Sequence, residues 1–203
     1  MKYFEPNFQD ADKKYYCSML KKVFSQPSLK EKRPCVGCQV PCNCTGSSTC
    51  TCKCNWDCEF ISIEISSDPI HFPIEKYIIP LVYELNVLRL CPTYYSCEGH
   101  ANDMGEVVKF PMVYFYSEII LMPVLFAEYI EQLKIDKILV YDWHIVALGF
   151  SPNMIPSYSM KINNNAKIKY RLDYLQNDIK KLSNGLAYNI QLLAKKNLNK
   201  LLA

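Results

Sequence analysis

Residues 35–58 read CVGCQVPCNCTGSSTCTCKCNWDC and hold eight of the eleven cysteines of this 203-residue chain. The eight are Cys35, Cys38, Cys42, Cys44, Cys50, Cys52, Cys54 and Cys58. Apart from Val36, Val40 and Trp56, the stretch has no large apolar side chain, so it cannot form a hydrophobic core of its own. Covalent bonds or metal ions must therefore hold its local structure.

The spacing of these cysteines is typical of thiolate ligands. C-x2-C at 35–38 can supply two ligands of a tetrahedral zinc site from one turn. The C-x-C units at 42–44 and 50–54 direct neighbouring thiolates apart, which suits adjacent metal ions or a shared bridge. Thiolates also bind iron–sulfur clusters and copper(I). We predict that all eight cysteines bind metal, with zinc favoured over iron–sulfur or copper(I), and with disulfides as the alternative if the chain is exported.

The first residues and the hydropathy favour a cytoplasmic protein. Residues 1–12 read MKYFEPNFQDAD and lack the charged start, apolar core and small-residue cleavage site of a secretory signal. No run approaches the roughly 18 apolar residues that a membrane helix needs. Because thiols stay reduced in the cytoplasm, this location again favours metal over disulfides.

Positive charge is concentrated near the end of the chain. Residues 151–203 have nine Lys or Arg against two Asp, in a chain whose net charge is +3. Such a basic tail could bind nucleic acid. However, its only arginine is Arg171 and it has few interleaved aromatic residues, so a solvated helix face is the better interpretation.

Hydrophobic periodicity predicts both helices and strands. Helices are expected at about 10–24, within 74–90, at 119–133 and over most of 166–203, where Asn184-Gly185 could form a break. Strands are expected at 60–65, 93–95, 111–116, 137–148 and 157–162. Elements in this order predict an α+β fold, with a mostly antiparallel sheet and helices on one side.

These patterns divide the chain into four segments. They are an N-terminal helix and basic linker at 1–34, a cysteine-rich metal-binding module at 35–58, an α+β domain at 59–165 and a C-terminal helical segment at 166–203. As one unbroken helix, the last apolar stripe would span about 45 Å. That length would favour a homodimer through a coiled seam, whereas a face packed on the core is the more ordinary interpretation.

The residues after the strand at 93–95 form a candidate site. Residues 96–100 read SCEGH, so Cys97 and His100 lie three positions apart. Such a pair can provide two metal ligands, or a nucleophile and its base. Gly99 permits a tight turn that would bring the two side chains together.

Two acidic residues near this pair could orient the imidazole, as in a catalytic triad. They are Glu98, within the motif, and Asp103, shortly after it. We predict that Cys97 is a nucleophile or a metal ligand, that His100 is the acid or base, and that Glu98 or Asp103 is the orienting group. The alternative is a buried cysteine beside a loop histidine, without chemistry.

Parts of the sequence resemble known families. The cysteines at 42–44 and 52–58 are similar to the zinc-thiolate knots that precede histone-methyltransferase catalytic domains and to the CXC domains of chromatin proteins, which implies metal binding alone. Residues 81–116, with their Ser-Cys-x-Gly-His motif, resemble small uncharacterised proteins of bacteria and phages. More faintly, the motif looks like the Ser-Cys-Ser-Gly-Arg stretch of the wybutosine-synthesising tRNA methyltransferases. Since Glu98 and His100 replace that family's serine and arginine, neither tRNA nor methyl transfer is carried over.

Three functions fit these observations. The leading hypothesis is a metal-thiolate protein, with zinc, whose SCEGH loop forms an active or ligand site for an unnamed substrate. The second is a nucleic-acid or protein-binding module in which the zinc cluster is structural. The third is a metal store or sensor, in which the cysteines themselves perform the function.

Overall fold

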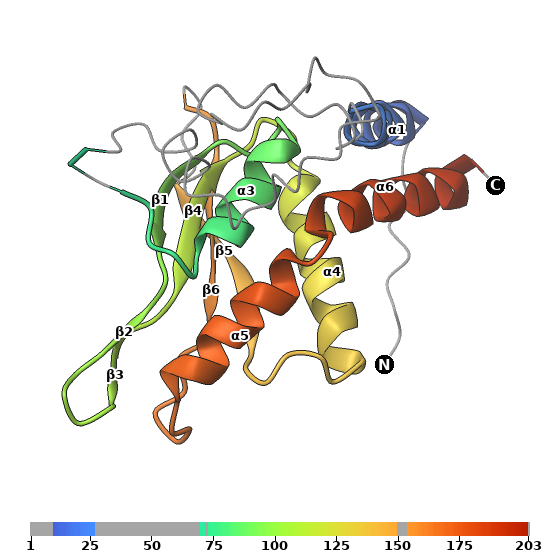
Figure 1. Ribbon diagram of the computed structural model, residues 1–203. Helices are drawn as coiled ribbons and strands as arrows, with labels where there is room; N and C mark the ends of the chain where they lie inside the picture. The colour runs from blue at the N-terminus through green and yellow to red at the C-terminus, as the bar shows by residue number, and fades with distance from the viewer. Residues whose placement is uncertain (1–9, 27–69, 72, 150–153, 203) are drawn as a thin grey trace, which may run out of the picture.

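The computed structural model of the protein describes residues 10–26, 70–71, 73–149 and 154–202 (Figure 1). The cysteine-rich stretch at 35–58 and the strand expected at 60–65 lie outside the described residues. The metal-thiolate module therefore stays a prediction. In the described ranges, no helix is both long and apolar enough to cross a membrane.

A four-stranded antiparallel sheet confirms the expected α+β architecture. Its strand order is β1-β4-β6-β5. The strands are β1 (Thr93–Cys97), β4 (Met112–Tyr116), β5 (Trp143–Gly149) and β6 (Ser157–Ile162). The region expected to be a loop after Cys97 also contains a small hairpin, formed by β2 (His100–Ala101) and β3 (Val107–Lys109).

One face of the sheet packs against helices, as predicted. The helices α3 (Ile79–Val87), α4 (Met122–Ile135) and α5 (Leu172–Ser183) lie together on one side of the sheet (Figure 1). In β4 the buried residues Val113 and Phe115 alternate with less buried ones, and the ring of Phe115 lies 5.3 Å from that of Phe126 in α4. The sheet therefore has a core face and an opposite outer face.

Prolines mark the starts of two helices. The sequence places Pro80 and Pro123 inside the patterns expected to be helical, and the structure places each in the first turn, of α3 and α4 respectively. Proline is tolerated there because the first N–H groups of a helix have no intrahelical partner. Both helices consequently begin later than their apolar pattern does.

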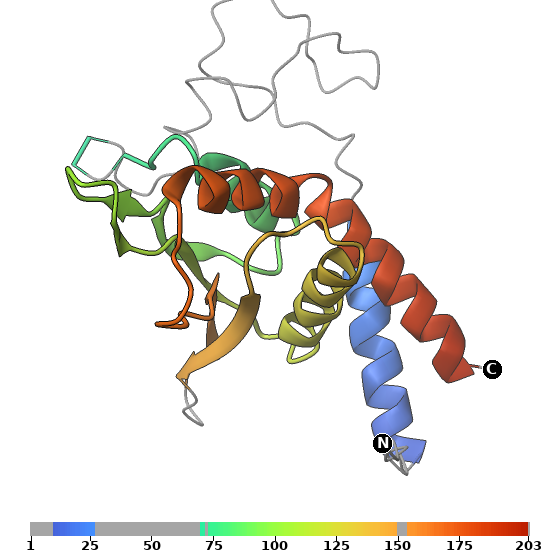
Figure 2. The same ribbon diagram turned by 90° about the horizontal axis from the view of Figure 1, so that it is seen from below.

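The terminal helices pack against the rest of the chain rather than extending from it. Gly185, with φ +67°, separates α5 from α6 (Leu186–Leu202). The expected break is confirmed, and an unbroken helix is wrong. Ile190 and Ala194 of α6 are buried, and α6 lies beside α1 (Asp10–Phe24), as Figure 2 shows. Much of the apolar stripe is thus covered by the chain itself, and a homodimer through a coiled seam stays a prediction.

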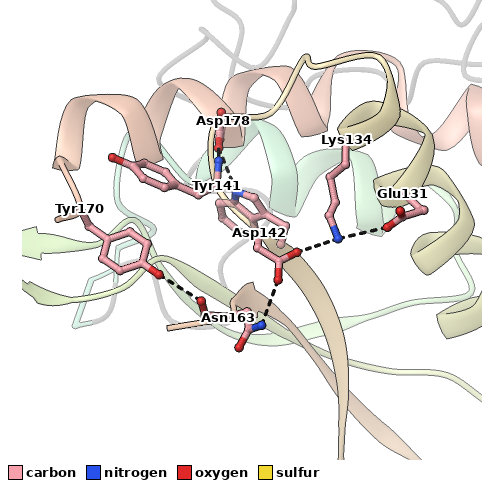
Figure 3. Close-up of polar contacts among 8 residues, drawn as sticks. Glu131, Lys134, Tyr141, Asp142, Asn163, Tyr170 and Asp178 are labelled. Atoms are coloured by element: carbon pink, nitrogen blue, oxygen red, sulfur yellow. Dashed lines mark hydrogen bonds and ion pairs between the residues drawn. The ribbon is translucent and has the colours of Figure 1, made fainter. Parts of the chain in front are cut away.

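A buried carboxylate positions the segment before β5. Asp178 of α5 is fully buried and accepts the backbone N–H of Tyr141 at 2.9 Å (Figure 3). It also accepts the backbone N–H of Val140 at 3.0 Å and the indole N–H of Trp143 at 3.3 Å. Residues 137–142 are therefore not strand, although their apolar pattern predicted one. The strand begins only at Trp143.

Ion pairing secures the same segment from the other side. Lys134 of α4 lies 2.6 Å from the carboxylate of Asp142, which also accepts the side-chain amide of Asn163 at 2.9 Å (Figure 3). These contacts lower the pKa of Asp142, chiefly through the hydrogen bond from Lys134. Helix α4, the start of β5 and the end of β6 are in this way held together. The core itself is a single cluster to which α1, the sheet and all the described helices contribute.

Candidate functional site

The SCEGH motif forms a sharp turn between β1 and β2. Gly99 has φ +87°, and a Cβ atom there would lie 2.9 Å from Cδ of Pro111 and 3.1 Å from Cδ1 of Leu172. The Gly99 backbone N–H donates to Sγ of Cys97 at 3.4 Å. Only glycine combines this backbone conformation with this close packing. The tight turn predicted at Gly99 is thus present.

A third residue, Glu75, completes the site. It lies in the turn before α3, and its Oε1 is 2.9 Å from Nε2 of His100. One ligand atom from each of Glu75, Cys97 and His100 lies within 4.8 Å of the other two. Three residue types that bind metals and move protons therefore converge from two separate loops.

The acidic residues named from the sequence have other positions. The carboxylate of Glu98 accepts the backbone N–H of Tyr77 at 2.7 Å, and Asp103 is exposed in the hairpin turn after β2. The carboxylate that meets the imidazole of His100 belongs to Glu75. Sequence reasoning missed Glu75 because nothing local connects it to the motif. Its one signal is a charge within the apolar run around it, IHFPIEKYIIPLV at 70–82.

Two reciprocal hydrogen bonds hold the loops together. Glu98 donates its backbone N–H to Oε2 of Glu75 at 2.7 Å, while its own side chain accepts the backbone N–H of Tyr77. Both oxygens of the Glu75 carboxylate are thus in contact with the motif. This arrangement fixes the carboxylate beside His100.

The environment of Cys97 favours the neutral thiol. The residue is 1% exposed, and burial raises the pKa of Cys97, as does the nearby Glu75 carboxylate. The Gly99 N–H and Lys109 lower this pKa, but by less than burial and Glu75 together raise it. Since reactive cysteines have depressed pKa values, Cys97 lacks the usual environment of a free thiolate nucleophile.

The three ligand atoms lie within 4.8 Å of one another, near the spacing of a tetrahedral metal site. Tetrahedral zinc, with ligand bonds of about 2.0–2.3 Å, requires ligand atoms about 3.3–3.8 Å apart. The side chains of His100 and Glu75 are 45% and 34% exposed, whereas Cys97 is buried behind them. A metal held here would thus face solvent on the side of His100 and Glu75.

The described part of the chain includes two further cysteines. Cys17 and Cys91 are free, buried and part of the hydrophobic core. Burial raises the pKa of Cys91 strongly. Of the cysteines in the described ranges, Cys97 alone lies within a group of residues able to hold a metal ion. The eight cysteines predicted as ligands, from Cys35 to Cys58, lie outside those ranges.

Comparison with known proteins gives no assignment. No protein family, curated protein or solved structure matches the chain. The resemblances drawn from the SCEGH motif and from the cysteine spacing stay predictions. Function must therefore be argued from the residues of the site.

Proposed function

We propose that this protein binds a single divalent metal ion, zinc by preference, through Glu75, Cys97 and His100. The observation that carries the proposal is the convergence of the three ligand atoms to within 4.8 Å. Carboxylate oxygen, thiolate sulfur and imidazole nitrogen are the three ligand types that zinc takes from proteins. Cys97 supplies the soft ligand that separates this site from one for magnesium or calcium.

Three protein ligands leave a fourth position open for water or for a substrate, which is the arrangement of catalytic zinc sites. The exposure of His100 and Glu75 would give a small molecule access to that position. Zinc bound there would act as a Lewis acid and lower the pKa of a bound water. The proposal is therefore an active site with hydrolytic potential rather than a closed structural site.

We extend the proposal to the cysteine-rich stretch at 35–58. Its eight cysteines and its lack of apolar residues support a separate zinc-thiolate module that stabilises that part of the chain. Such clusters require reduced thiols, so the proposed location is the cytoplasm. In this view one protein holds metal in two environments: sulfur alone at 35–58, and mixed ligands at Glu75, Cys97 and His100.

A second candidate uses the same residues as a nucleophile–base pair. The 2.9 Å contact between Glu75 and His100 is the geometry by which a carboxylate orients a catalytic imidazole. Cys97 would then be the nucleophile. The raised pKa of Cys97 opposes this candidate, because a nucleophilic thiol must ionise near neutral pH. A bound metal ion would remove that difficulty by displacing the proton.

Cobalt(II) titration of the full-length, metal-free, reduced protein tests the proposal. We expect His100→Ala and Cys97→Ser each to bind one metal ion fewer per chain than the unsubstituted protein. The matched control is His71→Ala, because His71 lies outside the ligand group. Counting ions per chain separates the site from the cysteine-rich stretch, which both variants leave unchanged.

Two results would contradict the metal site. The first is an unchanged number of bound cobalt ions in both variants. The second is that iodoacetamide alkylates Cys97 rapidly near neutral pH in the metal-free protein, and that this rapid alkylation is lost in His100→Ala. That second result would identify the nucleophile–base pair instead.

A further inference from the structure

Four tyrosines gather on the outer face of the sheet, opposite the helices. We call this cluster the tyrosine face; it consists of Tyr94, Tyr95, Tyr114 and Tyr116. The rings of Tyr94 and Tyr116 are stacked with centroids 4.3 Å apart, and those of Tyr95 and Tyr114 lie 5.0 Å apart. A further contact of 5.8 Å between Tyr94 and Tyr114 joins the two pairs.

An irregularity in β1 creates this arrangement. In the pairing with β4, Thr93 lies opposite Phe115 and Tyr95 lies opposite Tyr114, so Tyr94 has no partner of its own. A bulge of this kind lets two consecutive side chains point to the same face. Tyr94 and Tyr95 therefore both contact tyrosines of β4, where a regular strand would have turned one of them toward the helices.

The tyrosine face is open to ligands. Tyr94 and Tyr95 are 46% and 39% exposed. Among the described residues, the helices pack on the opposite face, where Phe115 contacts α4. Large exposed aromatic groups on adjacent strands have no role in packing the core, and clustered exposure of this kind marks binding surfaces.

The charge on this surface is positive. The four described strands of the sheet include no Asp or Glu. Lys161 of β6 lies opposite Met112 of β4 in the register, on the face that Tyr114 shares. Lys109 lies over the ring of Tyr95, with its Nζ 5.6 Å from the centroid. Lysines thus flank the tyrosines at two edges, and the strands provide no carboxylate to repel an anion.

We propose that the tyrosine face binds single-stranded nucleic acid, with bases stacked on the tyrosines and with phosphates near Lys109 and Lys161. Aromatic groups on a sheet bind successive bases because every base has a π-face, and a positive border follows the backbone. Neutral sugars also stack on tyrosine, but their hydroxyls favour carboxylate partners, which these strands lack. The surface is distinct from the lysines of α6 at the end of the basic tail, and the proposal does not depend on metal at Glu75, Cys97 and His100.

Fluorescence anisotropy tests this with the full-length protein and labelled oligonucleotides of roughly twelve uridines or thymidines. The double variant Tyr94→Leu with Tyr116→Leu keeps apolar bulk and removes the stacking rings. We expect it to bind about ten-fold more weakly. Tyr188→Leu is the matched control, because Tyr188 is an exposed tyrosine on α6, and it should leave binding unchanged. Comparing the two oligonucleotides shows whether RNA or DNA is preferred.

Lysine variants separate this surface from the lysines of α6. Lys161→Ala should weaken binding and reduce the slope of log affinity against log salt by about one, as expected for one phosphate contact. A triple change of Lys195, Lys196 and Lys200 to alanine should have no effect. If the tyrosine double variant has a lowered thermal midpoint, the binding of Lys161→Ala alone tests the proposal.

Three results would overturn the proposal. The first is no binding of either oligonucleotide at about 50 mM salt, where phosphate contacts are strong. The second is that the triple α6 variant loses binding while Lys161→Ala does not. The third is retention on a neutral polysaccharide that the tyrosine double variant abolishes, without any oligonucleotide binding.

Discussion

The imidazole Nε2 of His100 lies 2.9 Å from Oε1 of Glu75, across two loops that are far apart in the sequence. The other oxygen of the same carboxylate accepts the backbone N–H of Glu98. One side chain thereby joins the turn before α3 to the turn after β1. Because contacts from both loops hold this carboxylate in place, a ligand need not order the loops in order to bind.

The first prediction concerns the carboxylate of Glu75. Glu75→Gln keeps an oxygen that can accept the N–H of Glu98 but removes the negative charge that a metal ion requires. We expect metal affinity to fall at least about ten-fold, with little change in the thermal midpoint. Competition with a chromophoric chelator measures the affinity. Glu118→Gln is the control, because Glu118 lies after β4 and outside the ligand group. Equal affinities in the two variants would exclude Glu75 as a ligand.

The second prediction uses two glycines with positive φ. Gly99→Ala would suffer both backbone strain at φ +87° and a 2.9 Å approach to Pro111, whereas Gly105→Ala, at φ +77°, has nothing within 4 Å of its new Cβ. We expect Gly105→Ala to lower the free energy of unfolding by about 1 kcal/mol, and Gly99→Ala by about 2 kcal/mol more. Urea unfolding of both variants measures the difference. Equal losses would mean that the contact with Pro111 relaxes freely.

The local sequence pattern was sufficient to predict the helices and strands whose limits are set by neighbouring residues. Helix α1 has the limits expected from its apolar spacing, and the strands β4 and β6 lie within the ranges expected for them. The start of β5 could not be predicted from the local sequence pattern. Residues 137–142 are apolar enough for a strand, but the N–H groups of Val140 and Tyr141 bond to Asp178, which is distant in sequence.

The same distinction applies to the site. The turn at Gly99 and the approach of Cys97 to His100 are local, and the motif predicted them. The partner of the imidazole is not local: Glu75 precedes α3, and the two nearer acids, Glu98 and Asp103, are directed elsewhere by hairpin geometry and by the N–H of Tyr77. Long-range pairing of single side chains has no periodic signal in a sequence.

The third prediction tests Asp178 as the residue that positions the start of β5. Asp178→Ala would leave three N–H donors without an acceptor, those of Val140, Tyr141 and the Trp143 indole. Buried donors without partners are unfavourable, and we expect the free energy of unfolding to fall by about 3 kcal/mol. Asp173→Asn, on the exposed side of the same helix, should leave it nearly unchanged. A small loss in Asp178→Ala would show that water satisfies these donors.

The fourth prediction compares two buried serines. Ser159 lies in β6 with its Oγ buried and without a hydrogen-bond partner among the described residues, whereas Oγ of Ser117 accepts the N–H of Ile119 at 3.2 Å. Ser159→Ala removes an unsatisfied group, so the free energy of unfolding should stay the same or rise by about 1 kcal/mol. Ser117→Ala should lower it by about 1 kcal/mol. The opposite order in urea unfolding would contradict the assigned hydrogen bonds.

The fifth prediction concerns pH. Burial raises the pKa of Cys97, so the metal-free protein holds this thiol protonated at neutral pH, and metal binding must release the proton. Metal affinity should therefore rise by about ten-fold per pH unit while Cys97 is protonated in the free protein. In the metal-free protein a rise in pH has the opposite effect, because it lowers the free energy of unfolding. The unfolded chain loses this proton at lower pH than the folded protein does, so folding stability from Cys97 is fully present below the ordinary thiol pKa and declines above it.

Cobalt affinity of the full-length protein and of Cys97→Ser, measured across neutral pH, separates the site from the other cysteines. The ion that Cys97→Ser fails to bind should be the one whose affinity rises steeply with pH in the unsubstituted protein. Urea unfolding of the metal-free protein at alkaline pH checks the effect on folding stability. The free energy of unfolding should fall less with rising pH in Cys97→Ser than in the unsubstituted protein. A pH-independent cobalt affinity would mean that the thiol is already ionised before metal binds, which would return Cys97 to the role of nucleophile.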